Sequence, residues 1–421
     1  MPTTTRSVAE TCLAAKEASR KLAAVGSDVK NHALRAIAKT LLDHTEQIVA
    51  ANALDLQAAR EAGLSDALLD RLALDPARIA AVAHGVRKVA ALKDPVGEVI
   101  EGFRLPNGLD VRKVRVPLGV VAVVYEARPN VTIDAAALCL KSGNAVVLRG
   151  SRTAANSNAV LVALAADAVR QAGIPDGALA LVSGGGREEL AELATQTGTV
   201  DLIIPRGGEA LKQALKGVAT VPVIYAAAGN CHVYVDRRAD LEAAQEIVIN
   251  AKVQRPGVCN AAETLLVHAD VAAEFLPRVL HALHECGVTL HGDQRTRALV
   301  PDLPIRYATD EDWDTEYLAL EMAVGVVDRL PDAVDHINRH GSGHSEAIVT
   351  TDTAAARAFQ LGVDAACVYV NASTRFTDGG EFGMGAEIGN STQKLHVRGP
   401  IGLRELCTFK YLVEGSGHIR L

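Results

Sequence analysis

The sequence lacks long apolar runs and paired cysteines, and each absence excludes a class of protein; it is also poor in aromatic residues. No apolar run approaches the roughly 20 residues that a membrane-spanning helix needs, and residues 1–6 lack the apolar segment of a secretory signal. The 7 cysteines form no CxxC pair, which argues against a disulfide framework or a zinc site and is typical of a reducing cytoplasm. Only 3% of the residues are aromatic, so Ala and Val dominate the apolar share. We therefore expect a cytoplasmic protein with no membrane partner.

An excess of basic charge and a set of metal ligands are also missing. The formal net charge is −7, whereas a protein that binds nucleic acid normally presents a basic face. The 13 histidines do not cluster with cysteines or acids at metal-ligand spacing. His340 and His344 are four residues apart, but Gly341 and Gly343 argue against a helix that would bring them together. We expect neither a nucleic-acid partner nor a metal.

The chain has 421 residues, which is enough for two or three domains. Residues 7–93 follow the i, i+3, i+4 rhythm of helices throughout. Residues 97–116 instead predict a β-hairpin around the Asn-Gly turn at 107–108.

From residue 119 onward, short β-branched runs are separated by loops and mostly by helical segments. The predicted strands are Val120–Tyr125, Ala145–Leu148, Ala178–Val182, Asp201–Ile204 and Val221–Tyr225. Such alternation indicates a parallel sheet with both faces covered, and right-handed crossovers make it doubly wound and Rossmann-like. Ligands of such sheets bind beyond the carboxyl ends of the strands.

A second α/β series begins after Gly229. We expect strands at His232–Val235, Thr264–Val267, Ala347–Thr350 and Cys367–Asn371, and helices at Leu241–Val253, Val271–Cys286 and Ala333–Arg339. The predicted domains are therefore 1–96 with 117–229, which is Rossmann-like, and 230–391. The hairpin at 97–116 and the tail at 392–421, which contains an isolated strand, stand apart. We expect them to pair with each other, within the chain or across a dimer, as an oligomerisation element.

Cys259 is the strongest candidate for a catalytic residue. It lies in the turn Pro256-Gly257-Val258-Cys259-Asn260, between a predicted helix and a predicted strand, where a substrate can reach it. The neighbouring Arg255 favours the thiolate, which is the nucleophilic form of cysteine. The alternative is a buried, inert cysteine that serves only as a small apolar residue.

A nucleotide site is predicted at the carboxyl ends of the first strands. Arg149, Ser151 and Arg152 follow one strand, and this segment contains arginines but no acid, which favours NADP over NAD. A solvated strand end is the alternative. Glycines follow two further strands, at Ser183-Gly184-Gly185-Gly186 and at Gly207, where backbone N–H groups could approach a phosphate. The G-x-G-x-x-G fingerprint is absent.

Together these pieces resemble the aldehyde dehydrogenase superfamily and, within it, the gamma-glutamyl phosphate reductases, also called glutamate-5-semialdehyde dehydrogenases. The resemblance covers essentially the whole chain. Its most specific motifs are Val124–Thr132 (VYEARPNVT), Val253–Asn260 (VQRPGVCN), Val370–Gly383 (VNASTRFTDGGEFG) and Gly399–Leu403 (GPIGL).

The resemblance implies roles for individual residues. Cys259 would be the nucleophile, and the Asn130 side chain and the Cys259 backbone N–H would form an oxyanion hole. A helix N-cap is the other role open to Asn130. Arg149 and Ser151 would bind the adenosine ribose, Arg152 stands where NAD-using relatives often have Glu, and Glu321 resembles the acid that holds the nicotinamide ribose.

One departure from the superfamily favours its phosphate-dependent branch. Hydrolytic members carry a glutamate in a Glu-Leu-Gly-Gly element that activates water, whereas the corresponding stretch here is Ala226-Ala227-Ala228-Gly229-Asn230. The resemblance therefore implies NADPH-dependent reduction of gamma-glutamyl phosphate to glutamate 5-semialdehyde through a thioacyl enzyme, the second step of proline biosynthesis from glutamate. The rival readings are a hydrolytic or coenzyme-A-acylating dehydrogenase, and a non-catalytic binding protein on the same fold.

The substrate carries phosphate, carboxylate and ammonium groups, for which arginine and lysine are suitable partners. The candidates are Arg128, Lys252, Arg255 and Arg375, of which Arg375 lies in the most distinctive motif. Each of them could instead form a structural salt bridge. We expect functional coupling to a glutamate 5-kinase and a homodimer or homotetramer.

Overall fold

The computed structural model describes residues 6–182, 186–225 and 229–420. The chain divides into two compact units, each of which is described by itself. The first unit comprises Met1–Tyr225, Met384–Gly389 and Ile401–Leu421, and the second comprises Ala226–Gly383 and Asn390–Pro400. Among the described residues, none of the helices combines the length and the apolar character that crossing a membrane requires.

The first unit begins with a series of helices, as the periodicity of residues 7–93 predicts. These are α1 (Val8–Leu22), α2 (Ser27–Asp43), α3 (Thr45–Glu61), α4 (Asp66–Leu72) and α5 (Pro76–Ala91). Local sequence sets their ends. Ser7 and Glu10 form a reciprocal capping box at the start of α1, and Asp75 caps α5, whose first residue is Pro76.

A four-stranded parallel sheet follows, in the order β5-β4-β3-β6. Its strands are β3 (Val120–Tyr125), β4 (Ala145–Arg149), β5 (Leu179–Leu181) and β6 (Leu202–Arg206). The connecting elements are α6 (Asn130–Lys141), the 3-10 turn η1 (Arg152–Ala154), α7 (Ala155–Gln171), α8 (Arg187–Ala194) and, after β6, α9 (Glu209–Lys216). Every residue of β3 is buried, which explains its uninterrupted apolar sequence.

The prediction of a fifth strand at Val221–Tyr225 is wrong. That segment forms only an isolated bridge between Val223 and Ile203. The Pro222 carbonyl accepts a hydrogen bond from the Ile203 N–H. Because Pro222 has no backbone N–H to donate, the segment cannot continue the ladder of hydrogen bonds that a strand needs.

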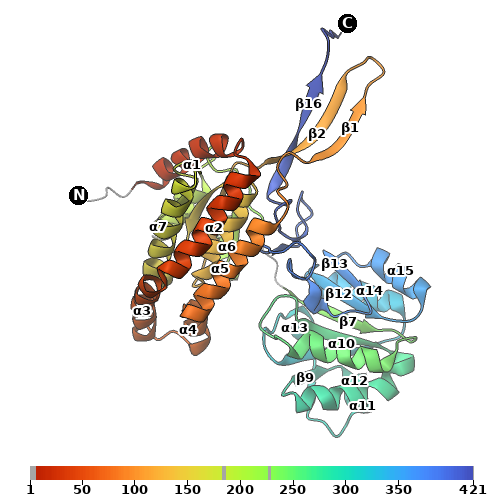
Figure 1. The fold of residues 1–421 in the computed structure, drawn as a ribbon. Coiled ribbons are helices and arrows are strands. Elements are labelled where there is room, and N and C mark those ends of the chain that lie inside the picture. Colours follow the sequence, from red (N-terminus) through yellow and green to blue (C-terminus); the bar gives the residue numbers. More distant parts are fainter. Residues whose placement is uncertain (1–5, 183–185, 226–228, 421) are drawn as a thin grey trace. The chain divides into compact units, whose positions relative to one another are not determined.

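The predicted hairpin is confirmed as β1 (Val99–Arg104) and β2 (Asp110–Pro117). Its turn contains Gly108 at φ +94°, a conformation that favours glycine. The C-terminal strand β16 (Cys407–Glu414) pairs antiparallel with β2 over its whole length. The hairpin and the tail therefore pair within one chain, as the three adjacent strands in Figure 1 show.

The second unit is built on a seven-stranded parallel sheet in the order β10-β9-β11-β8-β7-β12-β13. The strands are β7 (Cys231–Val235), β8 (Ala262–His268), β9 (Thr289–Gly292), β10 (Arg306–Tyr307), β11 (Glu321–Val327), β12 (Ser345–Val349) and β13 (Cys367–Val370). The helical elements are α10 (Leu241–Val253), α11 (Ala269–Glu285), α12 (Gln294–Leu299), α13 (Asp310–Asp314), α14 (Leu330–His340), α15 (Thr353–Gly362) and η2 (Thr374–Phe376). A short pair, β14 (Asn390–Ser391) and β15 (Gly399–Pro400), completes the unit.

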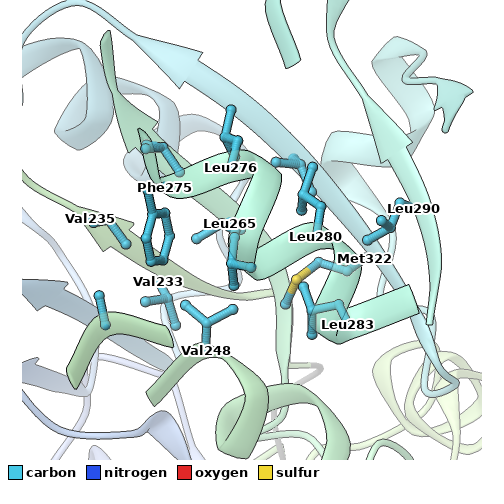
Figure 2. Packing of buried hydrophobic residues seen from close by; sticks show 14 of the residues in the cluster. Val233, Val235, Val248, Leu265, Phe275, Leu276, Leu280, Leu283, Leu290 and Met322 are labelled. Atoms are coloured by element: carbon cyan, nitrogen blue, oxygen red, sulfur yellow. The ribbon is translucent and has the colours of Figure 1, made fainter. Parts of the chain in front are cut away.

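Alternate residues of these strands enter different cores. Val233 and Leu265 face the core formed with α10 and α11, which contains Phe275, Leu280 and Met322 (Figure 2). Tyr234 and Leu266, their neighbours in sequence, join Ile337 and Phe359 of α14 and α15 on the opposite face. The sequence analysis did not predict β11, which lies between β9 and β8, although the apolar run after Glu321 is typical of a buried strand.

Candidate active site

Cys259 lies in a turn between α10 and β8, and its exposure is intermediate. Because all strands of this sheet are parallel, residues that precede them lie at one edge. Gly229 and Asn230 precede β7, Cys259 precedes β8, and Glu321 begins β11. The second unit therefore presents the thiol at the amino-terminal edge of its sheet.

The backbone of Cys259 is packed against the residues that precede β7. A Cβ atom on Gly229 would lie 1.5 Å from the Cys259 carbonyl oxygen and 2.6 Å from its Cα, so no larger residue fits. The thiol of Cys231 donates a hydrogen bond to the same carbonyl oxygen at 3.2 Å. Gly229 is itself held by Glu316, whose Oε1 accepts its N–H at 2.7 Å.

The other side of the turn is held by the segment after β13. The Asn260 side chain donates hydrogen bonds to the backbone carbonyls of Arg375 (3.3 Å) and Thr377 (3.0 Å). In return, the Thr374 hydroxyl donates to the Asn260 carbonyl at 2.7 Å. Cys259 is thereby fixed between two segments that are distant in sequence.

Arg375 places its guanidinium in the electrostatic neighbourhood of Cys259. Its Nε donates to Gln254 Oε1 at 2.8 Å. Burial lowers the pKa of Arg375, the positive charge of Arg255 lowers it further, and Asp378 and Cys259 act in the opposite direction. The Arg375 guanidinium is thus coupled electrostatically to the Cys259 thiol, and a positive charge of this kind favours the thiolate.

Lys252 forms a buried salt bridge, the structural alternative that we left open for it. Its ammonium group pairs with Glu263, and both side chains are fully buried. Burial raises the pKa of Glu263 to about 7 and lowers that of Lys252. The other Glu263 oxygen accepts the Leu318 N–H at 3.3 Å.

Glu321 stands at the first position of β11 and is partly exposed. Its Oε2 lies 3.1 Å from His291 Nε2 and 4.0 Å from Arg306 Nη1. Because β11 and β8 pair in parallel with Ala323 beside Thr264, Glu321 is close in register to the Cys259 turn.

Asn130 lies in the first unit, as the first residue of α6. Pro129 occupies the N-cap position and the Asn130 side chain caps nothing, so the capping alternative is wrong. The side-chain amide instead donates to Asp134 Oδ2, four residues on, at 3.1 Å. Burial raises the pKa of Asp134 to about 6. Arg128, two residues before Asn130, is exposed.

The end of β4 combines arginines with a buried, unpaired hydroxyl. Arg149 donates to the Gly186 carbonyl at 3.1 Å and lies 3.6 Å from Glu189. The Ser151 oxygen is buried and has no hydrogen-bond partner among the described residues. Arg152 is exposed beside a cavity of about 650 Å³. The cavity is lined by Arg6, Ser7, Val8, Arg152, Val182, Gly186, Arg187, Glu188, Glu189 and Glu192.

Gly207 has a packing reason to be glycine. A Cβ there would lie 2.7 Å from Glu126 Cδ and 2.8 Å from Leu211 Cδ2. Glu126 in turn accepts the Gly208 N–H at 3.1 Å. The predicted cofactor residues Ser183, Gly184 and Gly185 lie outside the described residues, as does the stretch 226–228.

The predicted site residues therefore fall into two groups. Cys259, Arg255, Arg375 and Glu321 gather at one edge of the second unit's sheet, whereas Asn130, Arg128, Arg149, Ser151, Arg152 and Gly207 follow strands of the first unit. Within the described ranges, no three His, Cys, Asp or Glu side chains are arranged to hold a metal ion.

Comparison with known proteins gives a consistent result. Residues 2–298 match the model of the aldehyde dehydrogenase family. The chain is 56% identical over 415 residues to the gamma-glutamyl phosphate reductase of Thermobifida fusca, covering 99% of both chains. It is 57% identical over 406 residues to that of Moorella thermoacetica, covering 96% of this chain and 97% of the relative.

The crystal structure of gamma-glutamyl phosphate reductase from Thermotoga maritima is similar along the whole chain. It superposes with a TM-score of 0.97 at 45% identity and covers 99% of this chain and 100% of its own. The chain belongs to the gamma-glutamyl phosphate reductase family. The resemblance and the aldehyde dehydrogenase fold expected from the sequence are both confirmed.

As a member of this family, the chain has a first unit whose residues suit an anionic nucleotide. The unpaired Ser151 hydroxyl offers a donor and acceptor, and Arg152 and Arg187 offer positive charge at the edge of the cavity. Glu188 and Glu192 line the same cavity, so its charge is mixed. The residues present thus fit an anionic nucleotide cofactor.

Sequence reasoning missed several residues that shape the site of this reductase-family chain. Gly229, Cys231, Gln254 and His291 support Cys259, Arg375 or Glu321 through contacts between distant segments. Of these, Gly229 and Gln254 gave a local signal, because they lie within stretches that the sequence analysis singled out.

Proposed function

We propose that this enzyme reduces L-glutamate 5-phosphate (gamma-glutamyl phosphate) to L-glutamate 5-semialdehyde and inorganic phosphate with NADPH, in the biosynthesis of proline. The observation that carries the proposal is the partly accessible Cys259 thiol, fixed in its turn beside Arg255 and Arg375. Its relatives at 56% and 57% identity bear the name of this activity over nearly their full length.

Cys259 performs the covalent step. Its thiolate attacks the acyl carbon, a C–S bond forms, and the bond from that carbon to the phosphate oxygen breaks, which releases inorganic phosphate. We assign the Asn130 amide and the Cys259 N–H to the developing oxyanion. Arg255 and Arg375 stabilise the phosphate as it leaves, with Arg128 as a further partner for the substrate's carboxylate.

Lys252 has a different part in this scheme. Its ammonium group is fully buried and paired with Glu263, so it is not available to a substrate anion in that state. We propose that the pair instead stabilises the end of α10 from which the Cys259 turn departs. Removing one partner would leave an uncompensated buried charge.

The resemblance to the family assigns a cofactor role to each of the predicted residues. Arg149 and Ser151 bind the adenosine ribose, and Arg152 binds the 2′-phosphate. Ser183, Gly184, Gly185 and Gly207 bind the neighbouring phosphates, and Glu321 binds the nicotinamide ribose. When bound, NADPH supplies the hydride that converts the thioester to the aldehyde. The absence of an acid at 226–228 keeps water from being activated beside the thioester.

We further propose a cytoplasmic location, a homo-oligomer and functional coupling to a glutamate 5-kinase. No two of the seven cysteines are spaced as a CxxC pair, which is typical of a reducing compartment. An acyl phosphate is readily hydrolysed, so a kinase that forms it must act close by. Strand β16 carries the exposed apolar side chains of Phe409, Tyr411 and Val413, which are suited to contact with a second copy of the chain.

The test is run in the oxidative direction with glutamate 5-semialdehyde and NADP. NADPH should accumulate over many turnovers only when phosphate or arsenate is present. Without either, at most one equivalent of NADPH per site should form, because the thioacyl enzyme has no activated attacker.

Cys259→Ala is the control, and it should lower kcat by at least about a thousandfold while leaving NADPH binding intact. Steady turnover to glutamate in phosphate-free buffer would place the chain in the hydrolytic branch. Turnover that depends on coenzyme A rather than phosphate would place it among acylating dehydrogenases.

A further inference from the structure

His291 lies between two carboxylates, and this arrangement has no part in the scheme above. It occupies β9 and is only 8% exposed. Its Nδ1 lies 3.0 Å from Asp312 Oδ1, and its Nε2 lies 3.1 Å from Glu321 Oε2. One imidazole ring thus connects a residue of α13 to the first residue of β11.

Asp312 is a fixed anchor for this ring. It accepts hydrogen bonds from the Thr309 N–H at 2.6 Å, the Thr309 hydroxyl at 2.7 Å and the Tyr317 hydroxyl at 2.8 Å. Burial pushes the pKa of Asp312 upward, but these hydrogen bonds and the charge of His291 bring it below its ordinary value. The Tyr317 ring stacks on His291 with 5.3 Å between centroids.

The geometry fixes the roles of the two ring nitrogens. Nδ1 faces Asp312 Oδ1, and Nε2 lies within hydrogen-bond distance of Glu321 Oε2. Glu321 Oε2 is then held by a charge-assisted hydrogen bond. The side chain of Glu321 is 35% exposed, and its contact with His291 uses Oε2 rather than Oε1. That oxygen remains available to a ligand.

We propose that His291, oriented by Asp312, is a positioning residue that holds Glu321 in the conformation that binds the nicotinamide-side ribose of NADPH. A free glutamate side chain samples several rotamers, and fixing one before the ligand arrives removes that entropic cost from binding. The proposal rests on the cofactor role proposed for Glu321. All the residues involved belong to the second unit, in which β9 and β11 are neighbouring parallel strands.

The experiment measures the Kd of NADPH by its fluorescence, on the full-length enzyme, without turnover. His291→Ala should raise the Kd about tenfold, which corresponds to about 1.4 kcal/mol. His291→Gln should recover most of the affinity, because its amide can donate from near the Nε2 position toward Glu321. His291→Asn, whose amide lies near Nδ1, should not. In steady state, the KM for NADPH should rise more than kcat falls.

Two further variants separate this proposal from the one on which it rests. Glu321→Gln should raise the Kd, and adding His291→Ala to it should cause little further loss, because His291 acts through Glu321. If Glu321→Gln leaves the Kd unchanged, the assigned role of Glu321 is wrong. If Glu321→Gln weakens binding but His291→Ala does not, or if the two losses add fully, His291 does not position Glu321.

The matched control is His281→Asn, which removes another His–Asp pair of the same unit. His281 Nε2 lies 2.8 Å from Asp302 Oδ2, and its side chain is more exposed than that of His291. It should leave the Kd unchanged. Thermal unfolding of each variant checks the fold. Should His291→Ala fail to fold, the contrast between His291→Gln and His291→Asn carries the same test.

Discussion

At the residue scale, burial distinguishes the proposed nucleophile from the other cysteines. Cys12, Cys139, Cys231, Cys367 and Cys407 are buried, and burial raises the pKa of Cys12 and Cys407 to about 12. Thiols of this kind are protonated at neutral pH and react slowly. Cys286 is exposed but lies just after α11, away from the site motifs. Cys259 alone among the seven combines access with neighbouring arginines.

Cofactor choice is also decided at single residues. Arg152→Glu replaces a guanidinium with a carboxylate where we place the 2′-phosphate of NADP. One charge-assisted contact contributes roughly 1.5–3 kcal/mol, so the KM for NADP should rise about tenfold to a hundredfold while that for NAD changes little. Equal changes in both KM values would remove Arg152 from the site. Arg187 lines the same cavity as Arg152. The variant Arg187→Glu therefore tests whether any loss of positive charge at the cavity raises the KM for NADP.

At the scale of elements, the start of β7 and the Cys259 turn form one packed unit. Gly229→Ala would place a methyl group on the Cys259 carbonyl, 1.5 Å away in the present geometry, and the turn would have to move. A displacement of about 1 Å at a reacting group can cost about a hundredfold in rate. We expect kcat and the rate of Cys259 alkylation by iodoacetamide to fall strongly.

Gly85→Ala is the control for that substitution. Gly85 lies within α5, and a Cβ there would meet nothing within 4 Å. Alanine has the higher helix propensity, so stability should rise by up to about 1 kcal/mol with activity unchanged. Full alkylation rates in Gly229→Ala would show that the Cys259 turn does not depend on this contact.

At the scale of the whole molecule, one face of β16 carries a row of exposed apolar side chains. Phe409, Tyr411 and Val413 alternate along β16, so they point to the same face. Val413 pairs with Val111, and Val111 pairs with Phe103 on β1. Tyr411 and Val413 are 56% and 55% exposed, which is unusual for neighbouring apolar residues unless another chain covers them.

We therefore expect Tyr411→Glu combined with Val413→Glu to dissociate the proposed homo-oligomer, as measured by light scattering after size-exclusion chromatography. Charge placed in an apolar interface is strongly unfavourable. Lys410→Glu, one position away and on the opposite face of β16, changes charge without touching the apolar face and should leave the mass unchanged. An unchanged mass in the double variant would mean that this face is not the interface.

The sequence by itself determined the elements and the chemistry that depend on neighbours along the chain. The sequence predicted the helices of the first 93 residues, the hairpin at its Asn-Gly turn and the Cys259 turn. These predictions were possible because caps, turn residues and apolar periodicity act over a few positions. The family motifs, with their acidic residue missing at 226–228, pointed to the reaction class.

Only the tertiary structure decided which distant residues meet. Gly229 against Cys259, Lys252 with Glu263, and His291 between Asp312 and Glu321 are contacts between separate elements, and strand order and register create them. No local pattern marks such pairs, because the spacing between partners depends on how the sheet is wound. The pairing of β16 with β2 was only one of two possibilities in the sequence, since an isolated strand can satisfy its backbone hydrogen bonds within its own chain or in a partner.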